Sequence, residues 1–230
     1  MSTVVLGPLT VRIDILVFFI SAVAGFLALR LRLRTREESA WILDTYVNAL
    51  LIGFIVWKFS IIIFDPIRTI QHPLSLLYFT GGDKGVWLGT ALALLYVGFR
   101  LNKNRSLLVS LVKAAMLAFL AGGFARYVFV WIWNDLMDEI SLMYAVLHAV
   151  LAAWAWIKYD TSIRGFVSIA LWYSIGAVLI PFFDAGRQTV IAGFTSIQIA
   201  YSILAFIILI GDILFSKQER HSGHNVKRGD

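Results

Sequence analysis

Long apolar runs alternate with short polar segments along the whole chain, and this alternation predicts a membrane protein. A helix that spans a bilayer needs about 20 mainly apolar residues. Seven stretches approach or exceed this length, and they cover residues 13–29, 43–64, 86–99, 107–133, 140–157, 165–183 and 194–215. The pattern therefore predicts an all-α, polytopic integral membrane protein with seven transmembrane helices.

Composition supports the same class. Of the 230 residues, 60% are hydrophobic and 15% are charged, and the mean hydropathy is +0.81. Soluble domains are about 45–50% apolar and about 25% charged, so a soluble domain is excluded as an interpretation. We expect one transmembrane domain at 1–216, followed by a basic cytoplasmic tail at 217–230.

Positive charges are distributed unequally between the two ends of the predicted spans. Thirteen cations lie on one side, namely Arg30, Arg32, Arg34, Arg36, Arg100, Lys103, Arg105, Lys158, Arg164, Lys217, Arg220, Lys227 and Arg228. Four lie on the other, namely Arg12, Arg68, Lys84 and Arg187. Because cations near spans concentrate in the cytoplasm, we predict an outside N-terminus and a cytoplasmic C-terminus. The net charge of +6 is mainly a topology signal, and no nucleic-acid partner is predicted.

Two further expectations concern the first span and the outer linker. The first span lacks a charged segment before it and a small-residue cleavage pattern after it, so we expect it to be retained in the membrane. The outer linker at 65–85 is half apolar and contains two prolines. We expect a short interfacial helix from Ile70 to Phe79, starting near Pro73, and a turn at Gly81-Gly82.

Generic catalytic and metal-binding motifs are missing from the sequence. The chain has no cysteine, so it has no disulfide, thiolate metal site or cysteine nucleophile of its own. It also shows no metal-ligand spacing in any span and no glycine-rich nucleotide-binding motif. We therefore expect neither a metal nor a cofactor, and any thiol in the chemistry belongs to a partner.

Five ionisable residues fall within the predicted spans, where a charge costs roughly 2.5–3.5 kcal/mol at the helix centre. They are Lys58, Lys113, Arg126, His148 and Asp212. Lys113 and Asp212 lie near the inner surface, where snorkelling relieves most of the cost, and we interpret them as structural. Lys58 and Arg126 lie roughly 9–10 Å below the outer surface, at 1.5 Å per residue.

The remaining polar candidates each allow two interpretations. Arg126 stays protonated and needs an anion, which is either an acidic side chain of segment 135–139 or a lipid phosphate. His148 has Tyr144 one turn before it on the same helix face, which suits a hydrogen bond between helices or a catalytic role. His72 lies in the outer loop, where a surface role is expected.

An ordered series of short motifs resembles the bacterial prolipoprotein diacylglyceryl transferases, over almost the whole chain. Ser141-Leu142-Met143-Tyr144 stands where that family has Thr-Gln-Leu-Tyr, and Tyr173 stands where it has Tyr-Gly. The other matches are Gly7-Pro8-Leu9-Thr10-Val11-Arg12, His72-Pro73-Leu74, Gly81-Gly82, Gly89, and Thr195 with Gln198.

The resemblance implies a cavity open sideways to lipid and a specific transfer reaction. The family moves the diacylglyceryl group of phosphatidylglycerol onto the lipobox cysteine of a lipoprotein precursor. By resemblance, Arg126 with Lys58 would bind the lipid phosphate, and Tyr173 and Tyr144 would donate hydrogen bonds. The enzyme would then have to supply a cation for the phosphate leaving group and a base for the substrate thiol.

The chain also departs from the family pattern. The segment Asp83-Lys84-Gly85-Val86-Trp87 lacks the histidine of the family, and Lys84 is the residue that could replace it. Further along the chain, Ala177, Pro181 and Asp184 stand where the family has Arg, Glu and Arg, respectively. Three functions are therefore considered: a diacylglyceryl transferase of the cell membrane, a non-catalytic member that binds a lipid or a partner membrane protein, and a small transporter. The transporter is the weakest, because the two halves share no broken-helix or charge pattern.

Overall fold

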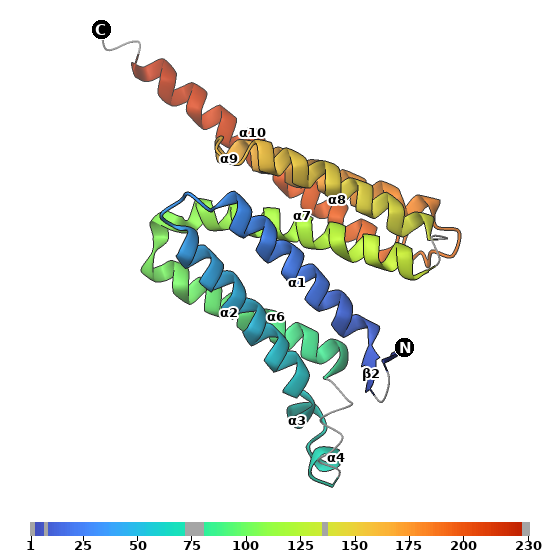
Figure 1. Ribbon diagram of the computed structural model, residues 1–230. Helices are drawn as coiled ribbons and strands as arrows, with labels where there is room; N and C mark the ends of the chain where they lie inside the picture. The colour runs from blue at the N-terminus through green and yellow to red at the C-terminus, as the bar shows by residue number, and fades with distance from the viewer. Residues whose placement is uncertain (1–2, 7–8, 72–80, 135–137, 227–230) are drawn as a thin grey trace. The chain divides into compact units, whose positions relative to one another are not determined.

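The computed structural model describes residues 3–6, 9–71, 81–134 and 138–226, which are almost entirely helical (Figure 1). Within these residues, seven helical segments are long and apolar enough to cross a membrane: Ile13–Arg32, Ser39–Phe64, Gly82–Lys103, Arg105–Trp133, Glu139–Ile157, Ile163–Phe183 and Ser196–Ile213. This confirms the predicted all-α fold with seven spans. The chain is a multi-pass membrane protein.

The helical structure follows from the lipid environment. Lipid offers backbone N–H and C=O groups no hydrogen-bond partner, so these groups must pair within the chain. In order they are α1 (Ile13–Arg32), α2 (Ser39–Phe59), α3 (Ile61–Phe64), α4 (Pro66–Gln71), α6 (Gly82–Lys103), η1 (Arg105–Leu107), α7 (Leu108–Trp133), α8 (Glu139–Ile157), α9 (Ile163–Leu179), η2 (Ile180–Phe183) and α10 (Ser196–Val226). Helix α10 extends beyond its apolar part into the segment predicted as a basic tail.

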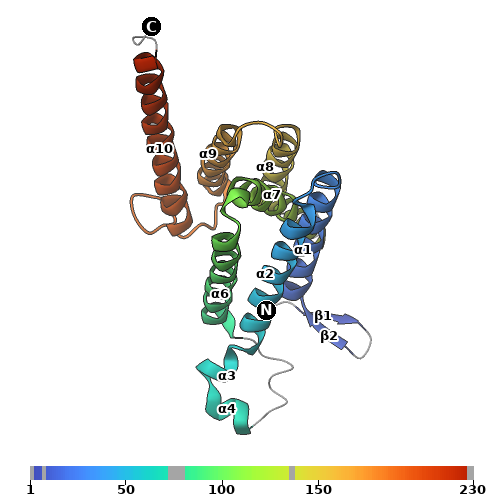
Figure 2. The same ribbon diagram turned by 90° about the vertical axis from the view of Figure 1, so that its left-hand side faces the viewer.

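A short β-hairpin precedes the first span and was not predicted (Figure 2). Strand β1 (Thr3–Leu6) pairs antiparallel with β2 (Leu9–Arg12), in a register that places Thr3 opposite Arg12. The strands contain Val4, Val5 and Val11, and β-branched residues favour extended backbone. Within the motif that begins the family resemblance, Leu9–Arg12 therefore form the second strand of this hairpin.

The outer segment after α2 is described only in part. Helices α3 and α4 follow α2, and α4 includes the first two residues of the expected helix Ile70–Phe79. The rest of that expected helix lies outside the described residues, so it stays a prediction. Helix α6 begins at Gly82, four residues before the expected span, and Gly82 has φ +57°, which glycine adopts without strain. Lys84 is consequently in the first turn of a helix, not in a loop.

By internal packing the chain forms two compact units. The first, here the α2–α6 unit, comprises Phe26–Ala115. Its helices α2 and α6 lie side by side in both ribbon views. A Cβ placed on Gly89 would lie only 2.5 Å from the carbonyl oxygen of Gly53. Small residues thus let the two backbones approach closely, as is usual for helices that associate in lipid.

The second, here the α8–α10 unit, comprises Met1–Gly25 and Met116–Asp230. Helix α9 packs against both α8 and α10, and its Phe166, Ile169 and Ala177 are buried. Helix α1 approaches α7 where a Cβ on Gly122 would lie 2.8 Å from the carbonyl oxygen of Ser21. These contacts hold together the helices that carry most of the predicted site residues.

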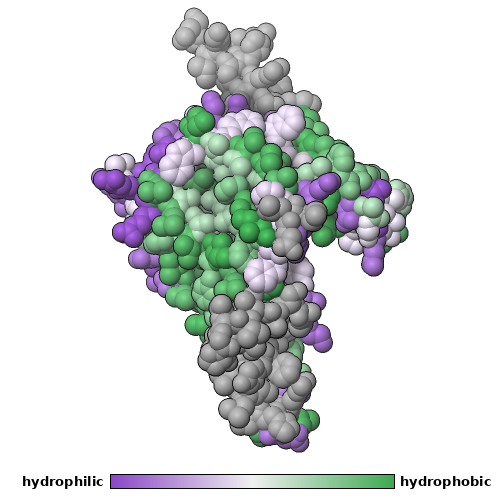
Figure 3. Space-filling model, turned by 45° about the vertical axis from the view of Figure 1, so that its right-hand side comes forward, coloured by the Kyte–Doolittle hydropathy of each residue, from purple (hydrophilic) through white to green (hydrophobic). Residues whose placement is uncertain are grey.

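Large apolar side chains remain exposed along the spans. Ile63, Trp87 and Ile157 are 68%, 76% and 74% exposed, and hydrophobic residues cover much of the face visible in Figure 3. A soluble monomer rarely exposes such extensive apolar surface, whereas lipid solvates it at no cost. The outward-facing residues therefore agree with the membrane assignment.

Candidate functional site

Four helices of the α8–α10 unit bring aromatic residues together. We define the aromatic cluster as Phe119 and Tyr127 of α7, Tyr144 and His148 of α8, Tyr173 of α9 and Tyr201 of α10. Phe119, Gly123 and Tyr127 follow one another at four-residue steps, so they share one face of α7. Tyr144 and His148 share a face of α8 in the same way. The cluster thus forms where three helical faces meet near the start of α10.

The rings of the cluster are in mutual contact. Tyr127 stacks on Tyr144 with ring centroids 4.8 Å apart, and the imidazole of His148 lies 5.2 Å from Tyr127 and 5.3 Å from Tyr173. Tyr173 in turn meets Tyr201 edge-on at 5.7 Å. Stacked and edge-on pairs at such distances are favourable beyond their area burial. The sequence-predicted Tyr144, His148 and Tyr173 therefore meet in one place.

His148 lies inside the cluster and is 1% exposed. Its Nδ1 is 2.8 Å from the carbonyl oxygen of Tyr144. Because a carbonyl only accepts, Nδ1 carries the proton, and in the neutral ring Nε2 keeps a free lone pair. The expected bond between helices is replaced by one within α8. Gly123 on α7 leaves the space that the ring occupies.

Arg126 lies next to the cluster on α7. Its guanidinium carbon is 5.5 Å from the centroid of the Tyr127 ring, and the side chain is exposed. Arg126 lies seven positions before Trp133, the last residue of α7, which corresponds to about 10 Å along the helix. Among the described residues, no carboxylate forms an ion pair with it. The cation therefore sits at membrane depth with an aromatic neighbour and no described anionic partner.

Asp138, one of the acidic residues considered as that partner, is already engaged. It caps α8 by accepting hydrogen bonds from the Ser141 N–H at 3.0 Å and the Ser141 hydroxyl at 2.6 Å, and it also accepts one from the Asn134 side-chain amide at 3.2 Å. Burial opposes ionisation, but these hydrogen bonds outweigh it and lower the pKa of the Asp138 carboxyl. Ser141, from the family-like motif, thus serves to start the helix that carries His148.

Gln198 and Thr195 form a reciprocal cap at the start of α10. The Thr195 N–H donates to Gln198 Oε1 at 2.8 Å, and the Gln198 N–H donates to the Thr195 hydroxyl at 3.2 Å. This is the capping-box geometry. Gln198 is fully buried and its Nε2 also donates to the Val178 carbonyl at 2.9 Å. The side chain therefore joins α10 to the end of α9.

The other predicted residues lie outside this unit. Lys58 is in the last turn of α2, and Lys84 near the start of α6 has its Nζ 6.0 Å from the centroid of the Phe64 ring. His72 lies outside the described residues. Because Lys58 and Arg126 belong to different units, their joint action on one phosphate stays a prediction.

Sequence reasoning missed three members of the cluster, Phe119, Tyr127 and Tyr201. The four-residue spacing of Phe119, Gly123 and Tyr127 is a signal that could have found the α7 face.

A scan against protein-family models, a search of curated proteins and a search of solved structures each return no match to this chain.

Proposed function

We propose that the chain binds an anionic phospholipid of the phosphatidylglycerol class, with Arg126 as the ligand for its phosphate. The observation that carries this proposal is an exposed guanidinium about 10 Å inside a span, without an ion pair among the described residues. Placing a permanently charged group at such depth costs free energy, and an anionic partner reduces that cost. Arginine binds phosphate through paired hydrogen bonds, and lipid head groups supply phosphate at the membrane surface, toward which a long arginine side chain can extend.

The neighbouring tyrosines complete the binding chemistry. Tyr127 lies directly beside Arg126 and stacks on Tyr144. Their hydroxyl groups can donate hydrogen bonds to the glycerol and phosphate oxygens of a head group, while their rings pack against its apolar part. Such a combination of apolar walls with a few polar groups is usual in ligand sites.

Retention of phosphatidylglycerol by the purified full chain tests the proposal. The measurement is the amount of lipid that survives detergent purification, determined by native mass spectrometry for wild type, Arg126→Gln, Arg126→Lys and the control Arg164→Gln. Arg164 is exposed near the start of α9, so its variant removes the same charge outside the membrane-depth position.

We expect Arg126→Gln to lower retention at least tenfold, since a hydrogen bond to a charged group contributes about 1.5–3 kcal/mol and every 1.4 kcal/mol is about a factor of ten. Arg126→Lys keeps the charge but loses the paired geometry, and should lie between the two. Arg164→Gln should match wild type. Equal retention by Arg126→Gln and wild type would reject Arg126 as the phosphate ligand.

A second function, diacylglyceryl transfer in the bacterial cytoplasmic membrane, is favoured by the tautomer of His148. Its Nε2 lone pair is suited to accept the proton of a lipobox cysteine thiol in a lipoprotein precursor. The thiolate sulfur would bond to the glycerol carbon of the lipid, and the carbon–oxygen bond to the phosphate would break. Arg126 would neutralise the departing glycerol phosphate. The burial of His148 makes lipid binding without transfer the first proposal.

A direct assay separates the two functions. Wild-type protein is incubated with phosphatidylglycerol and a lipobox peptide, and the peptide mass is followed for addition of a diacylglyceryl group. Complementation of a strain that lacks its own transferase provides the same test in cells. A diacylglyceryl-modified peptide supports transfer, whereas lipid retention without any modified peptide supports binding alone.

A further inference from the structure

A groove in the α2–α6 unit carries charges that neither the resemblance nor the proposed function uses. It has a volume of about 470 Å³ and is lined by Phe26, Arg30, Ala40, Leu43, Asp44, Val47 and Asn48. This volume lies within the range of about 300–1,000 Å³ typical of small-ligand sites. The lining residues come from the end of α1 and the start of α2, so the groove lies at one end of two adjacent spans.

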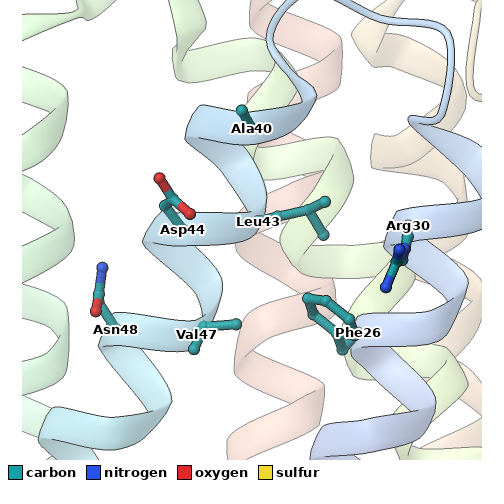
Figure 4. Close-up of a pocket in the computed structure, with 7 residues that line it drawn as sticks. All are labelled: Phe26, Arg30, Ala40, Leu43, Asp44, Val47 and Asn48. Carbon is teal, nitrogen blue, oxygen red and sulfur yellow. The ribbon is translucent and has the colours of Figure 1, made fainter.

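The charges in the groove are arranged on two sides of an apolar floor. Figure 4 shows Phe26 and Arg30 on α1, Leu43 and Val47 on the side of α2 that faces α1, and Asp44 and Asn48 on the other side of α2. Asp44 and Asn48 are four residues apart and share a helix face. Arg30 and Asp44 line the same groove, yet no ion pair joins them within the described chain.

The position of the groove along α2 matches the boundary between head groups and hydrocarbon. The span Ser39–Phe64 has 26 residues, or about 39 Å of helix, which exceeds a hydrocarbon core of about 30 Å. Asp44 is five residues from the start of this span, or about 7.5 Å along the helix. A lipid head group at this boundary would meet the charged residues, and its acyl chains would meet the apolar ones.

From this geometry we infer that the groove binds a zwitterionic phospholipid with a primary ammonium group, of the phosphatidylethanolamine type. The phosphate of the lipid pairs with Arg30, and its ammonium donates hydrogen bonds to the Asp44 carboxylate and the Asn48 side-chain oxygen. The first carbons of an acyl chain pack on Phe26 and Val47. A dipolar head group satisfies both separated charges at once, whereas phosphatidylglycerol offers no cation to Asp44.

The primary ammonium distinguishes this lipid from phosphatidylcholine, which has the same charges but no N–H donors. The test is native mass spectrometry of the full chain equilibrated with equimolar amounts of the two lipids, with identical acyl chains. We expect wild type to favour the ethanolamine lipid about tenfold, as befits charge-assisted hydrogen bonds. Stepwise N-methylation of the ethanolamine lipid should reduce binding with each donor removed, and this series needs no variant.

Variants then assign the effect to the two charged residues. Asp44→Asn should abolish the preference, while Arg30→Gln should weaken binding of both lipids equally and leave their ratio unchanged. The controls are Glu37→Gln and Arg34→Gln, which remove the same charges from exposed linker residues outside the groove. Equal binding of the two lipids by wild type, or an unchanged preference in Asp44→Asn, would overturn the inference. Retention of phosphatidylglycerol through Arg126 should be unaffected by Asp44→Asn.

Discussion

Replacing Gly123 by alanine tests whether the approach of α7 to α8 positions the aromatic cluster. A Cβ on Gly123 would fall against Cδ2 and Nε2 of His148 and 3.1 Å from its Cγ. The imidazole has little room to move, because it is 1% exposed and is held by the Tyr144 carbonyl at 2.8 Å. Other rings of the cluster surround it.

The expected cost follows from three contributions. Overpacking of a buried position costs about 1–3 kcal/mol, and displacement of the imidazole from its hydrogen bond costs about 0.5–1.5 kcal/mol. Alanine gains about 0.5–1 kcal/mol over glycine in a helix interior. The net loss in the free energy of unfolding is therefore about 0.5–4 kcal/mol. The control Gly98→Ala in α6, where no atom lies within 4 Å of the new Cβ, should gain about 0.5–1 kcal/mol.

Denaturant unfolding in detergent micelles, followed by helical circular dichroism, measures both free energies. A double variant then identifies the atoms responsible. If the clash is with the imidazole, Gly123→Ala should cost little in a His148→Ala background, where the ring is gone. The reasoning is refuted if Gly123→Ala is as stable as Gly98→Ala, or if its cost is the same with and without the imidazole.

Two further predictions concern the helix starts that support the site. Hydrogen bonds from Ser141 lower the folded-state pKa of Asp138 below the ordinary value of 3.8. Their stabilisation is present above the unfolded-state pKa and is lost as pH falls through the folded value. Unfolding midpoints of wild type should therefore fall once the pH drops below the ordinary carboxyl value, and those of Asp138→Asn, which keeps a capping side chain, should fall less. Gln198→Ala should lower the free energy of unfolding by about 2–4 kcal/mol, because it removes a cap and takes the Nε2 donor away from the half-buried Val178 carbonyl. Chemical unfolding checks this value against exposed Gln188→Ala, for which we expect a change within about 0.5 kcal/mol.

The spans were predictable because their signal lies in length and hydropathy alone. Each of the seven expected stretches overlaps a helical segment long enough to cross a bilayer. The segments that connect them were not predictable to the same degree. A hairpin of four-residue strands is too short for a periodic signal, and the start of α6 depends on contacts between distant residues: the Gly81 N–H donates to the Trp57 carbonyl at 3.2 Å. Such tertiary hydrogen bonds have no local sequence pattern.

The faces of the helices were the least predictable feature, and the aromatic cluster depends on them. In a soluble helix, one apolar stripe marks the buried face, but in lipid both faces of a span are apolar. Tyr144 and His148 attracted attention through their polarity, while Tyr127 and Tyr201 did not, because nothing in the sequence says which way they point. Glycines are the better guide, because a missing Cβ matters only where another helix comes close. Gly123 marks the approach of α7 to His148, and in the sequence it lies midway between Phe119 and Tyr127, the two residues of α7 that belong to the cluster.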